Sequence, residues 1–189
     1  MDVVETLTLE TIHSTTVSVP GDGLTHLQFR RFAGCPVCNM HLRSFVRRHD
    51  EIETAGIREV VFFHSSKEDL LEHASDLPFA VIADPRKRYY AKFGVESGKR
   101  ALFHPRVWGS ILKGVLLSLG DVLRGRKPAP SLRPEGGRWG LPADFLIDRD
   151  GAVVAVKYGE HAYDQWSVDE VLDLASHADS SRPAVLHHE

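Results

Sequence analysis

The chain has 189 residues, of which 42% are hydrophobic and 26% charged, a balance that supports a folded core and a polar surface. Its formal net charge of -3 gives no electrostatic reason to expect nucleic acid as a partner. The first residues are acidic and lack a basic stretch followed by a long apolar run, so no secretory signal peptide is predicted.

The N-terminal part predicts extended structure. Residues 3–19 alternate apolar and polar side chains and are rich in Thr, and residues 20–23 (Pro-Gly-Asp-Gly) form a turn signal. A third strand is expected over residues 27–32, and it leads directly to the cysteines.

Cys35 and Cys38 are the only cysteines and form a C-x-x-C motif where a strand is expected to give way to a helix. Cys35 would lie at the helix start, where unpaired N–H groups and the helix dipole favour an anionic sulfur. Arg30 and Arg31 add positive charge nearby. Cys38, one turn further on, is expected to be more buried and to keep its proton. The motif therefore predicts an accessible attacking thiol of lowered pKa, Cys35, and a resolving thiol, Cys38.

Two other interpretations of the cysteines compete with redox chemistry. A structural zinc site usually takes four ligands, but the chain has no second Cys pair, and His41 and His49 are scattered on the following helix. Two inert core cysteines are the other alternative, although Gly34 and Pro36 suit a helix entry instead. Redox chemistry is favoured, with no metal and no cofactor expected.

The next segments alternate between helix and strand. A helix with an apolar face is expected after Cys38 as far as Gly56, and residues 57–63 form an apolar run that suits a strand buried on both faces. Ser65 and Glu68 have the spacing of a capping box for a second helix. His64 lies where the strand ends, at the edge that carries function in parallel α/β sheets, so it is either a solvated loop residue or a group that protonates or polarises a ligand.

A strand over residues 79–84 and a short helix closed by Gly94 complete a β-α alternation, which predicts an α/β fold with parallel strands. Residues 97–139 interrupt this pattern with an apolar helix over 108–123. At about 25 Å that helix is short for a membrane span, and it carries charges. We expect it to pack on its own domain, with a homodimer interface or a contact with a membrane surface as the alternatives.

The last section predicts a β-hairpin over residues 145–156, turned at 148–151, and a final helix that starts at the capping box of Ser167 and Glu170. Residues 178–189 are expected to be a disordered tail. The sequence thus predicts one domain over residues 1–177, with the insertion at 97–139.

This order of elements resembles the thioredoxin fold, and more closely the peroxiredoxin-like branch of the alkyl hydroperoxide reductase/thiol-specific antioxidant (AhpC/TSA) superfamily. The resemblance rests on the stretch from Phe29 to Cys38, the long insertion, and the hairpin motif from Phe145 to Gly151, and it spans roughly residues 25–175. It implies a thioredoxin-like three-layer α/β fold with a central mixed sheet, an N-terminal β extension and a helical insertion before the last hairpin.

The sequence departs from true peroxiredoxins where peroxide is activated. Those enzymes place a Pro seven residues, and a Thr or Ser three residues, before the attacking Cys, and here Gln28 and Phe32 stand at those places. They also carry an Arg before the hairpin, where this chain has residues 141–143 (Leu-Pro-Ala). Pro142 instead matches the thioredoxin proline, which the resemblance implies to have a cis peptide bond and to lie against the disulfide.

The favoured function is therefore that of a cytoplasmic thiol–disulfide oxidoreductase or antioxidant protein, with Cys35, Cys38 and Pro142 as site residues and a protein or low-molecular-weight disulfide or thiol as substrate. The C-x-x-C pair without a secretion signal fits a reducing compartment. Two alternatives stay open: a two-cysteine peroxidase that reduces hydroperoxides, and a redox-responsive binding protein.

Overall fold

The computed structural model describes residues 3–95 and 140–180. Its main feature is a five-stranded sheet of order β5-β4-β3-β6-β7, beside a separate β1-β2 hairpin. The described elements are, in chain order, β1 (Leu7–Glu10), β2 (Thr16–Val19), β3 (Leu24–Arg30), α1 (Pro36–Arg47), α2 (His49–Thr54), β4 (Ile57–Phe63), α3 (Lys67–Ala74), β5 (Ala80–Ala83), α4 (Arg88–Lys92), β6 (Ala143–Ile147), β7 (Val153–Tyr158) and α7 (Val168–Ser180).

The sheet is mixed, with β3 at its centre. Strands β3, β4 and β5 run parallel, whereas β6 pairs antiparallel with β3 and β7 pairs antiparallel with β6. In the β3–β4 register Arg30 lies beside Phe63. The segments that leave these two strands therefore emerge side by side at one edge of the sheet, and α1 begins there.

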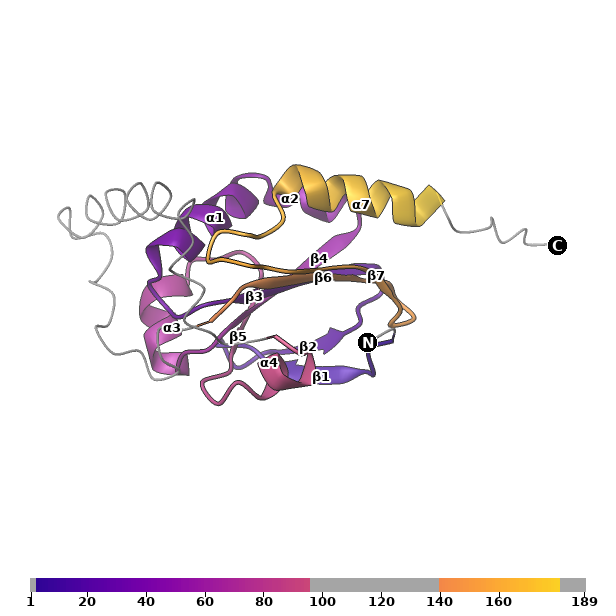
Figure 1. Cartoon of the computed structure of the whole chain (residues 1–189). Helices are drawn as coiled ribbons and strands as arrows, with labels where there is room; N and C mark the ends of the chain where they lie inside the picture. The colour runs from indigo at the N-terminus through magenta and orange to yellow at the C-terminus, as the bar shows by residue number, and fades with distance from the viewer. Residues whose placement is uncertain (1–2, 96–139, 181–189) are drawn as a thin grey trace.

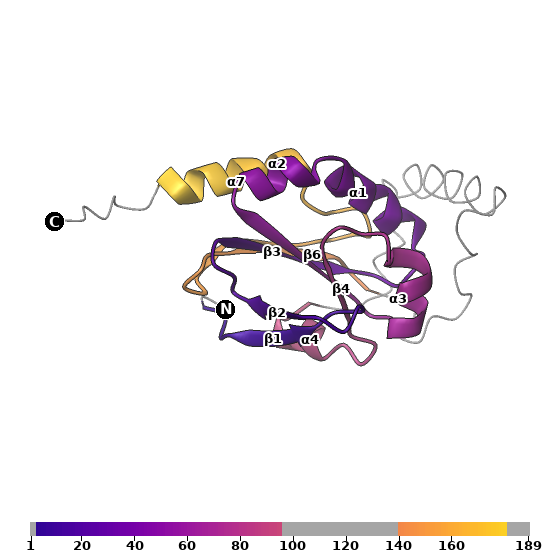
Figure 2. The same ribbon diagram turned by 180° about the vertical axis from the view of Figure 1, so that it is seen from behind.

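Layers of structure cover both faces of the sheet. Helices α1, α2 and α7 lie on one face, and α4 and the β1-β2 hairpin lie on the other (Figures 1 and 2). Two apolar clusters match these faces: one includes Phe45, Ile52 and Val171, and the other includes Phe29, Phe62 and Tyr90. The predicted three-layer thioredoxin-like fold, with its N-terminal β extension, is confirmed.

Several element boundaries differ from those expected. Strand β4 has the predicted bounds, but the third strand is Leu24–Arg30 rather than 27–32, because its pairing with both neighbours begins near Leu24. The long helix after Cys38 is interrupted at Arg48, whose φ of -116° and ψ of 21° separate α1 from α2.

The cap of α3 is shifted by one residue from the predicted one. Ser66 is the N-cap and accepts a hydrogen bond from the backbone N–H of Asp69. Ser65 Oγ instead accepts a hydrogen bond of 2.9 Å from the backbone N–H of Ala33. By contrast, Ser167 and Glu170 form the capping box that the sequence predicts.

The insertion at 97–139, with its expected apolar helix over 108–123, lies outside the described residues. Helix α7 continues past residue 177 to Ser180, and residues 181–189 also lie outside the described part. Among the helices of residues 3–95 and 140–180, none is long and apolar enough to cross a membrane.

A network of polar side chains runs through the core beneath α1. Both ring nitrogens of His26 contact carboxylates, Nδ1 with Glu59 Oε1 at 2.7 Å and Nε2 with Asp144 Oδ1 at 3.1 Å. Arg30 donates a hydrogen bond of 2.7 Å to the same oxygen of Asp144 and reaches His41 Nε2 on α1 at 3.4 Å. His26, Arg30 and Asp144 have no exposed surface.

The network favours the protonated form of His26. Burial alone would lower the pKa of His26, but the hydrogen bonds to Asp144 and Glu59 outweigh it and raise the pKa above its ordinary value of 6.5. At Asp144 burial opposes ionisation, yet Arg30 and His26 hold the pKa of its carboxyl well below the usual range. Asp144 thus faces both Arg30 and His26 inside the core, and removal of one partner would leave a buried charge uncompensated.

We predict that His26 makes stability fall as pH rises. The pKa of His26 is raised in the folded state. The stabilisation that protonated His26 contributes to the free energy of unfolding is therefore complete below the unfolded pKa of 6.5, and it is lost as pH rises through the folded pKa. Urea unfolding of the wild type and of His26→Gln between about pH 6 and about pH 9 measures this. The difference between the two free energies of unfolding isolates His26, since all other titrating groups are common to both proteins. A difference that is constant or grows with pH would contradict the assignment.

Candidate active site

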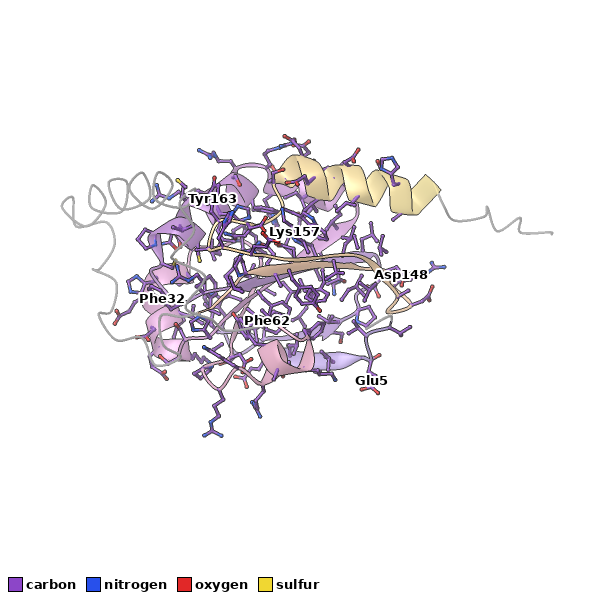
Figure 3. All side chains as sticks on the ribbon, viewed as in Figure 1. Glu5, Phe32, Phe62, Asp148, Lys157 and Tyr163 are labelled. Atoms are coloured by element: carbon purple, nitrogen blue, oxygen red, sulfur yellow. The ribbon has the colours of Figure 1, made fainter. Side chains whose placement is uncertain are left out.

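The cysteines lie at the start of α1, at the edge where β3 ends. Gly34 adopts a φ of 72°, which glycine tolerates, and Cys35 is the N-cap residue that precedes Pro36 at the first helical position. Phe32, three residues before Cys35, and Asp148, in the β6–β7 turn, lie at opposite ends of the sheet (Figure 3). The position of Cys35 at the helix start is as predicted.

Both cysteines are free thiols, and each is only 1% exposed. The expectation that Cys35 is accessible is therefore wrong. The sequence could not reveal this, because burial of the first helical turn depends on packing between distant segments. A thiol in this position meets a small molecule more readily than a folded protein, unless the site opens.

The two sulfurs have different proton affinities. A hydrogen bond from the Cys38 side chain is the largest influence on Cys35 and outweighs burial, and with Arg31 and the backbone N–H groups of Cys38 and Val37 it lowers the pKa of Cys35 to about 6. The pKa of Cys38 is raised well above its ordinary value by the same contact with Cys35 and by burial. The predicted direction for each thiol agrees with this arrangement.

Only one of the two arginines expected near the cysteines contacts them. The Nη1 atom of Arg31 lies 3.7 Å from Cys35 Sγ, and its guanidinium lies over the ring of Phe32, 5.3 Å from the ring centre. Arg30 instead extends into the core, where Asp144 accepts its hydrogen bond. Arg30 is the last residue of β3 and Arg31 is the first residue after it, so the two neighbouring arginines serve different parts of the molecule.

Pro142 does not have the geometry that the thioredoxin resemblance implies. Among residues 3–95 and 140–180 the one cis peptide bond is Val19–Pro20, so the predicted cis Leu141–Pro142 bond is wrong. Pro142 is buried, and its carbonyl accepts a hydrogen bond of 2.9 Å from the backbone N–H of Gly159. Its role in substrate docking stays a prediction, without the support of a cis bond.

His64 is buried at the end of β4, although the sequence left a solvated loop position open for it. Its backbone N–H donates a hydrogen bond of 3.2 Å to the carbonyl of Arg31, which precedes the cysteines by a few residues.

The buried polar network of His26, Arg30 and Asp144 was not predicted from the sequence. A signal was present, since His26, Gln28 and Arg30 alternate along one strand and so share one of its faces.

No metal site accompanies the cysteines in the described residues. Residues 3–95 and 140–180 hold no group of three or more His, Cys, Asp or Glu side chains arranged to bind a metal ion. The donor set around the two sulfurs consists of hydrogen-bond donors and a cation. This arrangement stabilises a thiolate without a metal ion.

A thioredoxin-like sheet with a C-x-x-C pair at the start of its first large helix defines a thiol-dependent oxidoreductase. Residues 43–161 match the model of the AhpC/TSA antioxidant enzyme family, and the chain belongs to that family. The matched range begins after Cys38, so the roles of the two sulfurs rest on the geometry above. Among curated proteins, none matches the chain significantly.

Solved structures share the fold at low sequence identity. Peroxidoxin BcpB from Mycobacterium tuberculosis is 17% identical, with a TM-score of 0.63 over 96% of this chain and 97% of that one. A mutant of peroxiredoxin 6 from Arenicola marina is 14% identical, with a TM-score of 0.66 over 97% and 77%. A protein described as a thiol:disulfide interchange protein DsbE, from Chlorobium tepidum, is 16% identical, with a TM-score of 0.57 over 94% of each chain.

We predict that Cys35 reacts first with an alkylating agent, at a rate that reaches half its maximum near the pKa of about 6. Removal of the cation in Arg31→Met should raise that pKa toward the ordinary value of 9.0, because a positive charge near the thiolate is lost. Mass spectrometry of partly alkylated, reduced protein identifies the labelled cysteine and gives the rate at each pH.

Arg47→Met is the matched control, since Arg47 is exposed in the last turn of the same helix and should leave the pKa of Cys35 unchanged. Faster labelling of Cys38 than of Cys35 would reverse the roles assigned to the two thiols.

Proposed function

We propose that the protein is a thiol–disulfide oxidoreductase that cycles Cys35 and Cys38 between dithiol and disulfide. The proposal rests on the difference in proton affinity between the two sulfurs, which favours a thiolate at Cys35 and a protonated thiol at Cys38. A thiolate is the attacking species in disulfide exchange, and its partner must be held ready but protonated until the second step.

The proposed reaction has two steps. The Cys35 thiolate attacks one sulfur of a substrate disulfide, forms a mixed disulfide and releases the first thiolate. Cys38 then loses its proton and attacks Cys35 Sγ, which closes the Cys35–Cys38 disulfide and releases the second substrate thiol. Two electrons pass from the protein to the substrate, and an external thiol donor must restore the dithiol. The substrate is a protein or low-molecular-weight disulfide.

A second candidate, reduction of hydroperoxides by the same two thiols, is favoured by a different observation. Both cysteine residues are only 1% exposed, so a small oxidant has easier access than a protein disulfide. In that reaction the Cys35 thiolate takes an oxygen from the peroxide to become a sulfenic acid, and Cys38 condenses with it and releases water. Arg31 would supply a positive charge beside the reacting sulfur, although Gln28 and Phe32 replace the residues that normally activate peroxide.

We also propose a cytoplasmic location and one thioredoxin-like domain over residues 1–177. The location is supported by the two free thiols of the C-x-x-C pair, a state that a reducing compartment maintains. The single domain is supported by the one sheet that strands β3 to β7 form together. A homodimer through the apolar segment 108–123 remains a proposal from sequence, since that segment lies outside the described residues. Its test is the mass of the particle in solution for the wild type and for Leu116→Asp.

Turnover assays with matched cysteine variants test the proposed function. Catalytic amounts of the wild type, with dithiothreitol, should accelerate reduction of insulin disulfides. Cys35→Ser should abolish that activity, because it removes the nucleophile. Cys38→Ser should form the mixed disulfide with substrate but fail to resolve it, because the second attacking sulfur is missing.

The same proteins are offered hydrogen peroxide as the competing substrate. Fast peroxide consumption without insulin turnover would replace the proposal by the second candidate. If neither substrate is turned over, the remaining alternative is a redox-responsive binding protein.

A further inference from the structure

Tyr90 joins the ends of strands β3 and β4 through its hydroxyl group. The residue belongs to α4 and is buried. Its hydroxyl donates a hydrogen bond to the carbonyl of Arg30 and lies 3.0 Å from the carbonyl oxygen of Phe62, so its single proton is shared between the two strands. The reaction described above gives this contact no role.

Tyr90 is held in place from several sides. The Asp84 carboxylate accepts hydrogen bonds from three backbone N–H groups in the first turn of α4, including that of Tyr90. The Tyr90 ring packs edge-on against Phe29 of β3, with ring centres 5.1 Å apart. Burial, followed by the charges of Asp84 and Cys38, raises the pKa of Tyr90 well above its ordinary value of 10.0. The hydroxyl therefore keeps its proton and remains a donor.

The carbonyl of Arg30 and the N–H of Arg31 belong to one planar peptide unit. The N–H of that unit donates a hydrogen bond to the Cys38 sulfur, and its carbonyl accepts the hydrogen bond from Tyr90. A hydrogen bond to the carbonyl holds the plane of the unit and polarises it, which strengthens its N–H as a donor. Tyr90 is thus linked to Cys38 through a single peptide group.

This N–H gains importance in the second step of the proposed reaction. In the dithiol, the contact with Cys35 and burial raise the pKa of Cys38. In the mixed disulfide Cys35 is no longer a thiolate, so its contribution to that rise is lost. The two groups of Arg31 that lower the pKa of Cys38, its guanidinium charge and its backbone N–H, then act against burial alone.

We propose that Tyr90 is a positioning residue for the resolving thiol, an inference that rests on the proposed function. Its hydroxyl holds the Arg30–Arg31 peptide so that the Arg31 N–H faces Cys38 Sγ as that sulfur ionises. Cys38 loses its proton to water, its sulfur bonds to Cys35 Sγ, and the bond from Cys35 to the substrate sulfur breaks. The departing thiolate takes a proton from water, so Cys38–SH plus Cys35–S–S–R gives the internal disulfide plus R–SH. Tyr90 itself exchanges no proton.

Single-turnover quench-flow with mass spectrometry tests this role, because it counts the mixed disulfide and the internal disulfide separately over time. The probe is 2-hydroxyethyl disulfide. Tyr90→Phe removes only the hydroxyl, so mixed-disulfide formation on Cys35 should stay within about twofold of the wild type. Resolution should be about threefold to tenfold slower near neutral pH, because a hydrogen bond to the Cys38 thiolate is weakened.

The pH profile of resolution separates this role from general support of the fold. In Tyr90→Phe the rate should reach half its maximum at a higher pH than in the wild type, because Cys38 ionises less readily. At high pH, where Cys38 is ionised in both proteins, the two rates should converge. A site that is merely loosened would be slower at every pH.

Tyr158→Phe is the matched control. The Tyr158 hydroxyl also donates to a backbone carbonyl, that of Phe93 at the end of α4, at 2.9 Å. Its loss should leave both steps unchanged. If Tyr90→Phe does not fold, 3-fluorotyrosine placed at position 90 tests the same link in the opposite direction. Its hydroxyl is a stronger donor, so resolution should be faster than in the wild type.

Resolution in Tyr90→Phe within about twofold of the wild type, or an equal slowing at every pH, would overturn the inference. A 3-fluorotyrosine protein that resolves no faster than the wild type would do the same. These results leave the proposed function intact as long as the wild type forms and resolves the mixed disulfide on Cys35. Failure of the wild type to form it would instead overturn the proposed function, and the inference with it.

Discussion

The candidate active site depends on one constraint, which is that a thiolate buried in the protein must be compensated at the sulfur itself. At Cys35 the compensation comes from the Cys38 side chain, the first N–H groups of α1 and the Arg31 guanidinium. The same contact that stabilises the anion on Cys35 holds the proton on Cys38. The asymmetry between the proposed attacking and resolving thiols is therefore a property of the pair, and it needs no difference in exposure, since both cysteines are equally buried.

The end of β3 supplies charged side chains both to the core and to the cysteines. Arg30 and Arg31 are neighbours in sequence, yet one enters the core to pair with Asp144 and the other faces Cys35. The core beneath α1 consequently carries its own cations and anions, and Arg30 reaches His41 on the helix that bears the cysteines. Because a buried ion pair is costly to break, the Arg30–Asp144 pair holds Arg30 in place beneath α1.

Features set by local sequence were predictable. Strand β4 follows from a seven-residue run in which five residues are apolar, and the helix start at Cys35 follows from Gly34 and Pro36 around a cysteine. The shift of the α3 cap to Ser66 was not predictable, because the Ser65 hydroxyl accepts a hydrogen bond from the backbone N–H of Ala33, which is 32 residues away. The His26–Asp144 contact joins residues 118 positions apart, and no local pattern encodes such a pair.

In the candidate site too, features set by local sequence were predictable and features set by the packing of distant segments were not. The identity of the two thiols and the direction of each pKa shift could be read from the C-x-x-C spacing. The burial of Cys35, the choice of Arg31 over Arg30 and the trans Leu141–Pro142 bond depend on how distant segments pack. The resemblance to thioredoxins suggested a cis proline because the order of elements is similar, but the order of elements does not determine the conformation of a single peptide bond.

The central claim is that Cys35 and Cys38 form one two-electron redox couple. Equilibration of the protein with glutathione buffers of graded ratio, followed by acid trapping and intact-mass spectrometry, tests this most directly. The account predicts a single transition from the dithiol to an internal Cys35–Cys38 disulfide, with a mass loss of two hydrogens and little glutathione adduct. Both cysteines remaining thiols across the range, or Cys35 remaining bound to glutathione, would contradict it.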